Sequence, residues 1–409
     1  MKGEFLVDDL VRPNIRTLTP YRCARDDYNT GILLDANENA YGPAALPPPP
    51  PGSNNSSGEA ASADGCARYH RYPDPLNLDV KAMYTAWRGL PGPEWAFFGV
   101  GSDEAIDIIM RVFGVPGRYK ILICPPTYGM YSVSAATNDL GVVKVPLDVT
   151  AGRFQLRVDE ILAATANDDD IRMMFLCSPG NPTGVRLDPR DVRRILESDY
   201  RGLVIIDEAY IDFVEAAASA SADDSATEDA KGSLAQWTMR YPNLIVMQTL
   251  SKSFGLAAIR LGVALASPRT IHWLNVIKAP YNIPAPTIAL AKQALSPEGI
   301  ERMRGVVQQL LTERKRLTET LRTLPGVLRV MGHTDANFVL CVIRGRGTNM
   351  PDSLRAARIY QWMADEGVVV RYRGHEPGCE GCLRITVGTS AETDATIAKL
   401  AEALANPSL

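Results

Sequence analysis

The stretch IVMQTLSKSFGLAAIRLG, residues 245–262, joins a short apolar run to a polar turn and then to a second apolar run. The apolar runs at 244–248 and 261–266 have the length of buried strands, and turn residues bound them. The turn between them holds Ser251 and Lys252. In layered α/β folds, functional side chains gather in the loops that follow the strands. The stretch therefore predicts a buried strand followed by a loop that contains a lysine.

Short apolar runs alternate with longer amphipathic segments through most of the chain before Pro284. Further expected strands lie at 120–124, 173–177 and 203–206, and expected helices at 103–113, after a capping Ser102, and at 191–197. Strands that alternate with helices indicate layers of helices around a central sheet. The pattern predicts an α/β fold with a mostly parallel sheet.

Beyond Pro284 the pattern changes to long helices followed by separated strands. Residues 287–321 are compatible with helix apart from a break near Pro297. Later strands are expected at 337–343, 368–371 and 383–387, and helices at 353–366 and 393–405. This part of the chain predicts a smaller α+β domain.

These patterns divide the chain into three parts. Residues 1–40 are expected to form an N-terminal arm that packs with the small domain, 41–280 a large domain, and 281–409 the small domain. Two low-complexity stretches interrupt the large domain, at 44–67 and 216–232. Both are too rich in small and polar residues to bury a face, so they are expected to be surface insertions.

Bulk composition indicates an ordinary globular protein. The chain has 409 residues, of which 46% are hydrophobic and 22% charged. A net charge of −4 argues against nucleic-acid binding, which favours a basic face. No apolar run has the length of a membrane span, and the N-terminus lacks the features of a signal or transit peptide. The seven cysteines do not suggest a disulfide framework, so we expect a cytoplasmic protein.

Polar residues follow three of the expected strands. Asp207 and Tyr210 lie in LVIIDEAYIDF, Asn181 lies in the turn of CSPGNPTG, and Lys252 follows the strand described first. Each has an ordinary interpretation when taken alone: the aspartate as a helix cap, the asparagine as a turn residue, the lysine as a surface charge. Their joint appearance at strand ends favours a shared site.

The set matches what pyridoxal phosphate requires of a protein. Its aldehyde needs a lysine amine with which to condense, and its pyridine nitrogen needs a carboxylate that keeps it protonated. Its phenolic oxygen needs hydrogen-bond donors, and its phosphate needs backbone amides and hydroxyls at the start of a helix. The candidates, in the same order, are Lys252, Asp207, Asn181 with Tyr210, and Gly101–Ser102–Asp103, with Ser251 and Arg260 as further phosphate ligands.

The motifs, taken in order along the chain, resemble the fold-type I aminotransferases, and within them the histidinol-phosphate aminotransferase family. The matching stretches are LTPYRCAR, LDANENAYG, RYPDP, GVGSDEAID, CPPTYGMYSVSA, CSPGNPTG, DEAYIDF, TLSKSFGLAAIRLG, ANFVL, VVVRYRG and GCLRITVGT. The resemblance covers nearly the whole chain. The two insertions depart from the family pattern without removing a motif residue, and the first lengthens the path to Tyr72.

The resemblance implies a role for each motif residue toward the cofactor. Lys252 would bind it covalently and carry protons, and Asp207 would pair with the pyridine nitrogen. Tyr210 and Asn181 would bond its phenolic oxygen, and the ring of Tyr128 would stack on it. Its phosphate would be held by Ser102, Asp103, Ser251, Arg260 and, from a partner subunit, Tyr72. The last residue implies a homodimer with shared active sites.

Four residues would bind substrate by the same resemblance: Tyr21, Asn337, Arg371 and Arg384. Arg384 matches the clamp for the carboxylate of glutamate, and Arg371 matches an additional arginine for substrate phosphate. Planar arginine donors serve both anions. The implied reaction is reversible transamination of L-histidinol phosphate with 2-oxoglutarate, which gives imidazole-acetol phosphate and L-glutamate in histidine biosynthesis.

Other functions remain open at this point. An aromatic-amino-acid aminotransferase, or a lyase acting on a phosphorylated amino acid, would share several of the motifs. A non-catalytic sensor is disfavoured because Lys252 is retained and no space precedes Arg12 for a DNA-binding module. His375, Cys379 and Cys382 form H-x3-C-x2-C, but no fourth ligand is evident, so no metal is predicted.

Overall fold

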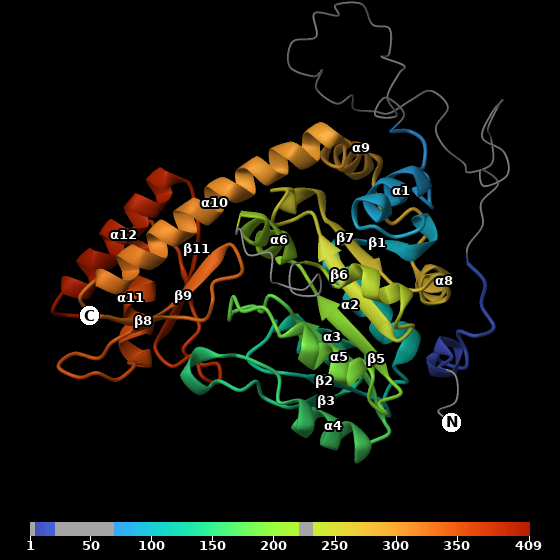
Figure 1. Ribbon diagram of the computed structural model, residues 1–409, viewed down its shortest axis with the longest axis horizontal. Coiled ribbons are helices and arrows are strands. Elements are labelled where there is room, and N and C mark those ends of the chain that lie inside the picture. The colour runs from blue at the N-terminus through green and yellow to red at the C-terminus, as the bar shows by residue number, and fades with distance from the viewer. Residues whose placement is uncertain (1–4, 21–68, 221–231) are drawn as a thin grey trace, which may run out of the picture.

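The computed structural model describes residues 5–20, 69–220 and 232–409, which form two sheets covered by helices (Figure 1). The low-complexity stretch 44–67 therefore lies outside the described residues, as does most of 216–232. No helix among the described residues is long and apolar enough to cross a membrane.

The larger sheet has seven strands in the order β1-β7-β6-β5-β4-β2-β3. Strand β7 runs antiparallel to both of its neighbours, and the other pairings are parallel. The expectation of a mostly parallel α/β sheet is confirmed. The strands are β1 Ala96–Val100, β2 Lys120–Ile123, β3 Gly141–Lys144, β4 Ile171–Cys177, β5 Leu203–Asp207, β6 Leu244–Thr249 and β7 Leu261–Leu265.

Alternate residues of the central strands point into two separate hydrophobic clusters. In β5, Leu203 and Ile205 belong to one cluster and Val204 and Ile206 to the other. The first cluster includes side chains of α2 (Gly101–Phe113), α3 (Met130–Thr137) and α8 (Pro268–Ile277). The second includes those of α1 (Leu78–Trp87), α4 (Val158–Ala166) and α5 (Pro189–Leu196). A parallel sheet buried on both faces explains why its strands read as continuous apolar runs.

The described part of the N-terminal arm, residues 5–20, packs on the large sheet and not with the small domain as expected. Its short helix η1 (Val7–Leu10) contributes to the cluster under α2 and α8. Asp8 accepts a hydrogen bond from Trp273 Nε1 at 2.6 Å and pairs with Arg269 at 2.7 Å. The apolar pattern of this short segment is compatible with packing on either domain. The bonds from Asp8 to Trp273 and Arg269 join the segment to α8.

The smaller sheet is antiparallel, with the order β10-β11-β9-β8. Its strands are β8 Val327–Met331, β9 Phe338–Ile343, β10 Arg371–Tyr372 and β11 Cys382–Thr386, and its other helices are α11 Ser353–Asp365 and α12 Ser390–Ala405. Helix α10 (Pro297–Thr323) runs from α9 (Ala285–Ala294), beside α1, to the small sheet (Figure 1). It links the two parts of the fold physically. The domain limits at 40 and 280 stay a prediction.

Several expected elements differ in detail. Ser102 is not a helix cap, because α2 begins at Gly101 and its N-cap residue Val100 offers no side-chain bond. The strand expected at 368–371 is only β10, Arg371–Tyr372. Strands β1, β3 and β8 were not expected. Of these, β3 has no buried residue and so no apolar pattern to find.

Candidate active site

Three neighbouring parallel strands end at the same edge of the large sheet and bring the predicted residues together. Asp207 is the last residue of β5 and lies opposite Cys177, the last residue of β4. Asn181 follows β4 within a tight turn, and Lys252 follows β6. The carboxyl ends of parallel strands are where α/β proteins bind ligands. The order of strands in the sheet therefore explains how residues 71 positions apart in sequence share a site.

Asp207 is buried, with 4% of its surface exposed, and is held in one orientation. Tyr131 donates its hydroxyl to Oδ2 at 2.7 Å, and the backbone N–H of Ala209 donates to Oδ1 at 3.2 Å. Burial raises the pKa of Asp207, although the bond from Tyr131 opposes the shift. A buried carboxylate without a cationic hydrogen-bond partner stabilises a nearby positive charge. The arrangement fits a protonated pyridine nitrogen.

Tyr131 is a candidate functional residue that sequence reasoning missed. It lies three residues beyond Tyr128 in TYGMYSVSA, so the quoted stretch contained it. Its ring is fully buried and stacks on Phe175 with a centroid separation of 5.2 Å. Its place in the quoted motif stretch was the available signal, because Tyr128 precedes α3 (Met130–Thr137) and no helical spacing links the two tyrosines.

Lys252 lies in the turn after β6, and its Nζ is 5.9 Å from the centre of the Tyr210 ring. The side chain is exposed, but the protein around the amine still removes enough water to lower its pKa, and Arg384 lowers it further. A lowered pKa raises the fraction of neutral, nucleophilic amine. Tyr210 itself is buried, and its ring meets Phe338 edge to face at 5.3 Å. The lysine is thus placed and tuned to condense with a carbonyl group.

The first turn of α2 offers the backbone N–H groups of Ser102 and Asp103 to an anion, whereas that of Gly101 donates to Arg260 O at 2.8 Å. No side chain caps this helix, and Ser102 and Asp103 belong to its first turn. Gly101 has a φ of 70°, and a Cβ there would lie 2.4 Å from Nη2 of Arg260. The positive φ favours glycine at this position, and a larger residue would also displace the end of the Arg260 side chain. Uncapped N–H groups with a nearby arginine fit a phosphate group.

Arg260 and Tyr128 converge on this helix start through Asp103. The Nη2 atom of Arg260 lies 3.3 Å from Oδ2 of Asp103, and the Tyr128 hydroxyl donates to Oδ1 at 3.1 Å. Ser251 is close in sequence to Lys252, and its hydroxyl lies 2.8 Å from that of Thr249. Asp103 therefore orients Arg260 and the ring of Tyr128 at the candidate phosphate-binding site.

Two arginines face each other across the edge of the small sheet. Arg371 of β10 is the direct register partner of Arg384 of β11. Arg384 Nη1 donates to Asn181 Oδ1 at 2.5 Å, and its guanidinium lies 5.3 Å from the centre of the Phe338 ring. Burial lowers the pKa of Arg384, and Arg373 and Arg371 add to the shift. Like charges placed directly opposite are destabilising, so this pair favours an anion.

The unpaired state of these two arginines strengthens that conclusion. Nε of Arg384 is buried and has no hydrogen-bond partner among the described residues. No carboxylate of the described residues forms an ion pair with Arg371 or Arg384. The bond from Arg384 to Asn181 also ties this anion site to the turn after β4. The two candidate sites are therefore adjacent.

The remaining predicted residues are placed less directly. Asn337 precedes β9, and its backbone oxygen accepts a bond from Val387 N at 2.9 Å. Tyr72 is 54% exposed and stacks on Tyr281 with a centroid separation of 4.6 Å. Its role at a partner subunit's site stays a prediction. Tyr21 lies outside the described residues.

The chain is similar to known proteins along nearly its whole length. The model of the family described as aminotransferase class I and II matches residues 29–404. The histidinol-phosphate aminotransferase of Saccharomyces cerevisiae is 42% identical over 409 residues, and the alignment covers 97% of each chain. That of Schizosaccharomyces pombe is 44% identical over 398 residues, covering 95% of each. The structure of histidinol-phosphate aminotransferase from Sinorhizobium meliloti in complex with pyridoxal-5'-phosphate has a TM-score of 0.69 and 25% identity, covering 82% of this chain and 83% of that one.

Proposed function

Because the chain belongs to the class I and II aminotransferases, we propose that it is a pyridoxal-phosphate-dependent enzyme of histidine biosynthesis. It transfers the amino group of L-histidinol phosphate to 2-oxoglutarate and forms imidazole-acetol phosphate and L-glutamate. The observation that carries the substrate assignment is the pair Arg371 and Arg384, opposed in register and unpaired with any carboxylate of the described residues.

The residues at the sheet edge would hold the cofactor. Asp207 would keep the pyridine nitrogen protonated, and Tyr210 and Asn181 would bond the phenolic oxygen. Ser102, Asp103, Ser251 and Arg260 would surround the phosphate, and Tyr128 would cover the ring. When bound, the cofactor supplies an electron sink for the substrate's α-carbon. Lys252 Nζ would take the proton from that carbon and would deliver it to the cofactor carbon.

The arginine pair explains how one pocket accepts two kinds of anion. In one half-reaction the pocket must hold the phosphate of histidinol phosphate, and in the other a carboxylate of glutamate. Planar guanidinium groups bind both anions in bidentate geometry. A doubly charged phosphate would neutralise both Arg371 and Arg384 and remove their mutual repulsion. Asn337 and Tyr21 are proposed to complete this pocket.

We also infer a cytoplasmic homodimer with shared sites, in which Tyr72 reaches the cofactor phosphate of the partner subunit. The exposed ring of Tyr72 supports this role, because a large exposed aromatic residue is typical of an interface. Sedimentation of the purified protein tests the dimer. A monomer at concentrations that sustain full activity would contradict it.

The test of the substrate assignment is a panel of amino donors with 2-oxoglutarate as acceptor. Histidinol phosphate should give a higher kcat/KM than phenylalanine or threonine phosphate, with glutamate as product. Faster transamination of phenylalanine would instead support an aromatic-amino-acid aminotransferase. Release of carbon dioxide from threonine phosphate would support a lyase.

A further inference from the structure

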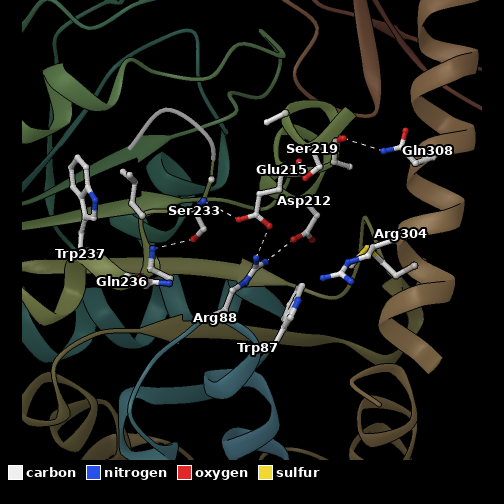
Figure 2. A pocket seen from close by; sticks show the side chains of 16 residues that line it. Trp87, Arg88, Asp212, Glu215, Ser219, Ser233, Gln236, Trp237, Arg304 and Gln308 are labelled. Atoms are coloured by element: carbon white, nitrogen blue, oxygen red, sulfur yellow. Dashed lines mark hydrogen bonds and ion pairs between the residues drawn. The ribbon is translucent and has the colours of Figure 1, made fainter. Parts of the chain in front are cut away.

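A buried arginine joins three elements behind the turn that carries Lys252. Arg88 follows α1 and is one of the residues that line a cavity of about 870 Å³ (Figure 2). Figure 2 shows it directed at Asp212 and Glu215, at 2.6 and 3.0 Å. Both acids belong to α6 (Ile211–Ala220). Its Nε donates to the side chain of Gln248 in β6 at 2.7 Å. One guanidinium thus fixes α1, α6 and β6 to each other.

The two residues that follow Lys252, Ser253 and Phe254, attach its turn to this network. Ser253 is 2% exposed and donates its hydroxyl to Oδ2 of Asp212, while Arg88 occupies Oδ1. Phe254 meets the ring of Trp87 edge to face at 5.3 Å. Within the turn itself, Gly255 N donates to Lys252 O and Leu256 N donates to Leu250 O, each at 3.1 Å. The side chains after the lysine therefore supply its connection to α1 and α6.

Asp212 also connects the turn to the cofactor-facing segment. It lies two residues after Tyr210 and five after Asp207, in the same DEAYID run. A carboxylate bonded by arginine on one oxygen and serine on the other is held by charge-assisted bonds, which are strong in a buried setting. The backbone at Ser253 cannot shift without breaking one of them. The distance between the Lys252 backbone and the Asp207–Tyr210 segment is set by this connection.

We propose that Ser253, Asp212 and Arg88 form a positioning network for Lys252. The network fixes where the lysine amine can reach, and it touches neither cofactor nor substrate. The inference rests on the proposed function, because it requires that Lys252 bind the cofactor. Displacement of a reacting group by about 1 Å lowers rates up to 100-fold, so loss of the network should appear in turnover more than in binding.

The first experiment compares Ser253→Ala with a matched control. Ser253→Ala should lower kcat about tenfold or more, while KM for both substrates changes less than about twofold. The companion Asp212→Asn keeps the volume of the side chain and should show the same division between kcat and KM. The control is Thr238→Val, which removes another buried hydroxyl whose bond, to Ala235 O at 2.7 Å, stays within the short helix η5 (Ala235–Met239). Its kcat should stay at the wild-type value.

The second experiment uses cofactor binding in a double-mutant cycle. In the presence of Lys252, Ser253→Ala should slow covalent capture of pyridoxal phosphate by the cofactor-free protein. In a Lys252→Ala background, the same change should alter the Kd for noncovalent pyridoxal phosphate by less than about twofold. Equal weakening in both backgrounds would mean that Ser253 supports the cofactor pocket in general, and would overturn the proposal.

The outcomes separate this inference from the proposed function. If the wild-type protein captures no pyridoxal phosphate at Lys252, both are overturned. If the wild-type protein transaminates while Ser253→Ala and Asp212→Asn retain its kcat and its rate of capture, the positioning network alone is overturned.

Discussion

Charged side chains have different surroundings at the edge of the large sheet and at the edge of the small sheet. At the large sheet, Asp207 is bonded by Tyr131 and Ala209, and Asp103 is bonded by Arg260 and Tyr128. At the small sheet, Arg371 faces Arg384 in register, with no carboxylate of the described residues between them. Both carboxylates of the first region are hydrogen-bonded within the chain, whereas the facing arginines of the second region fit an anion.

From this difference we expect the proposed cofactor to stay bound while the proposed substrate exchanges. A cofactor that remains through many turnovers requires a rigid and satisfied pocket, which preorganised bonds provide. A substrate that enters and leaves is better served by a pocket whose repulsion it relieves, because release then restores a state that attracts the next anion. Asn181 lies between the two regions, since it accepts the bond from Arg384.

Loss of the lysine should abolish the chemistry of the large-sheet edge while leaving its binding groups in place. Lys252→Ala is expected to lower kcat about 10⁴-fold or more, on the scale that follows removal of a covalent catalyst. The variant should still bind pyridoxal phosphate noncovalently. In the wild-type protein, borohydride should fix the cofactor to the peptide that contains Lys252. Label on another lysine would remove the cofactor assignment.

Removal of the buried negative charge should be the next most damaging change. Asp207→Asn keeps the side-chain volume and is expected to lower kcat about 10³-fold, in the range found when one electrostatic contact to a reacting group is lost. Tyr131→Phe is the matched variant, because it keeps the charge and removes one bond to it. It should lose about tenfold, given roughly 1.5 kcal/mol for a bond to a charged group. Near-normal turnover in Asp207→Asn would contradict the assigned role.

Much of the large-sheet edge could be predicted from sequence, and the reason is physical. Asp207 ends a fully buried strand, Lys252 follows another, and Asn181 follows a strand that is buried except at Arg172. The continuous apolar run of each strand marks where the polar residues begin. Parallel pairing then places such strand ends together. The position of Tyr131 required knowledge of how α3 lies on the sheet, which no local pattern contains.

The small-sheet edge was less predictable for the opposite reason. Strand β10 has only two residues, and neither is buried, so its bounds leave no apolar pattern. Arg371 and Arg384 lie opposite each other because of the antiparallel register of β10 and β11, and this register cannot be read from a single sequence. Residues 5–20 were likewise assigned to the wrong partner, because a short apolar segment can pack on either domain. Patterns of burial are visible in sequence, and the pairing of partly exposed elements is not.

Loss of Arg384 should impair both half-reactions, since both anions require it. Arg384→Gln is expected to reduce kcat/KM about 100-fold for histidinol phosphate and for 2-oxoglutarate alike, because two charge-assisted contacts per anion are lost. Single-turnover measurements of each half-reaction check this result. A loss confined to one half-reaction would show that the arginines do not share the pocket.

Loss of Arg371 should be selective for phosphate. Arg371→Gln removes a charge-assisted bond worth roughly 1.5–3 kcal/mol, which corresponds to at least about a tenfold fall in kcat/KM for histidinol phosphate. Slow activity on phenylalanine, which carries no phosphate, should change much less. Both donors are to be measured in the same preparation. Equal losses on the two donors would remove the phosphate role of Arg371.

The smallest effect tests whether the two regions influence each other through charge. Burial and Arg384 lower the pKa of Lys252, so removal of the Arg384 charge should raise it. Capture of an aldehyde requires the neutral amine. A higher pKa leaves less neutral amine at any pH on the acid side of the midpoint. In the cofactor-free Arg384→Gln protein, the pH midpoint of pyridoxal capture should therefore move upward, and capture below it should slow.

Pyridoxal is the suitable probe because it lacks the phosphate that the arginines could bind. Arg371→Gln is the control, since Arg371 is not among the groups that shift the pKa of Lys252. The shift in the Arg384 variant should shrink in added salt if it arises from charge, because salt screens partly exposed groups. A midpoint that stays fixed or moves downward would show that the anion pocket and the lysine titrate independently. An upward shift would mean that an anion bound at Arg384 also makes Lys252 more basic, so that substrate binding favours the amine's role as proton acceptor.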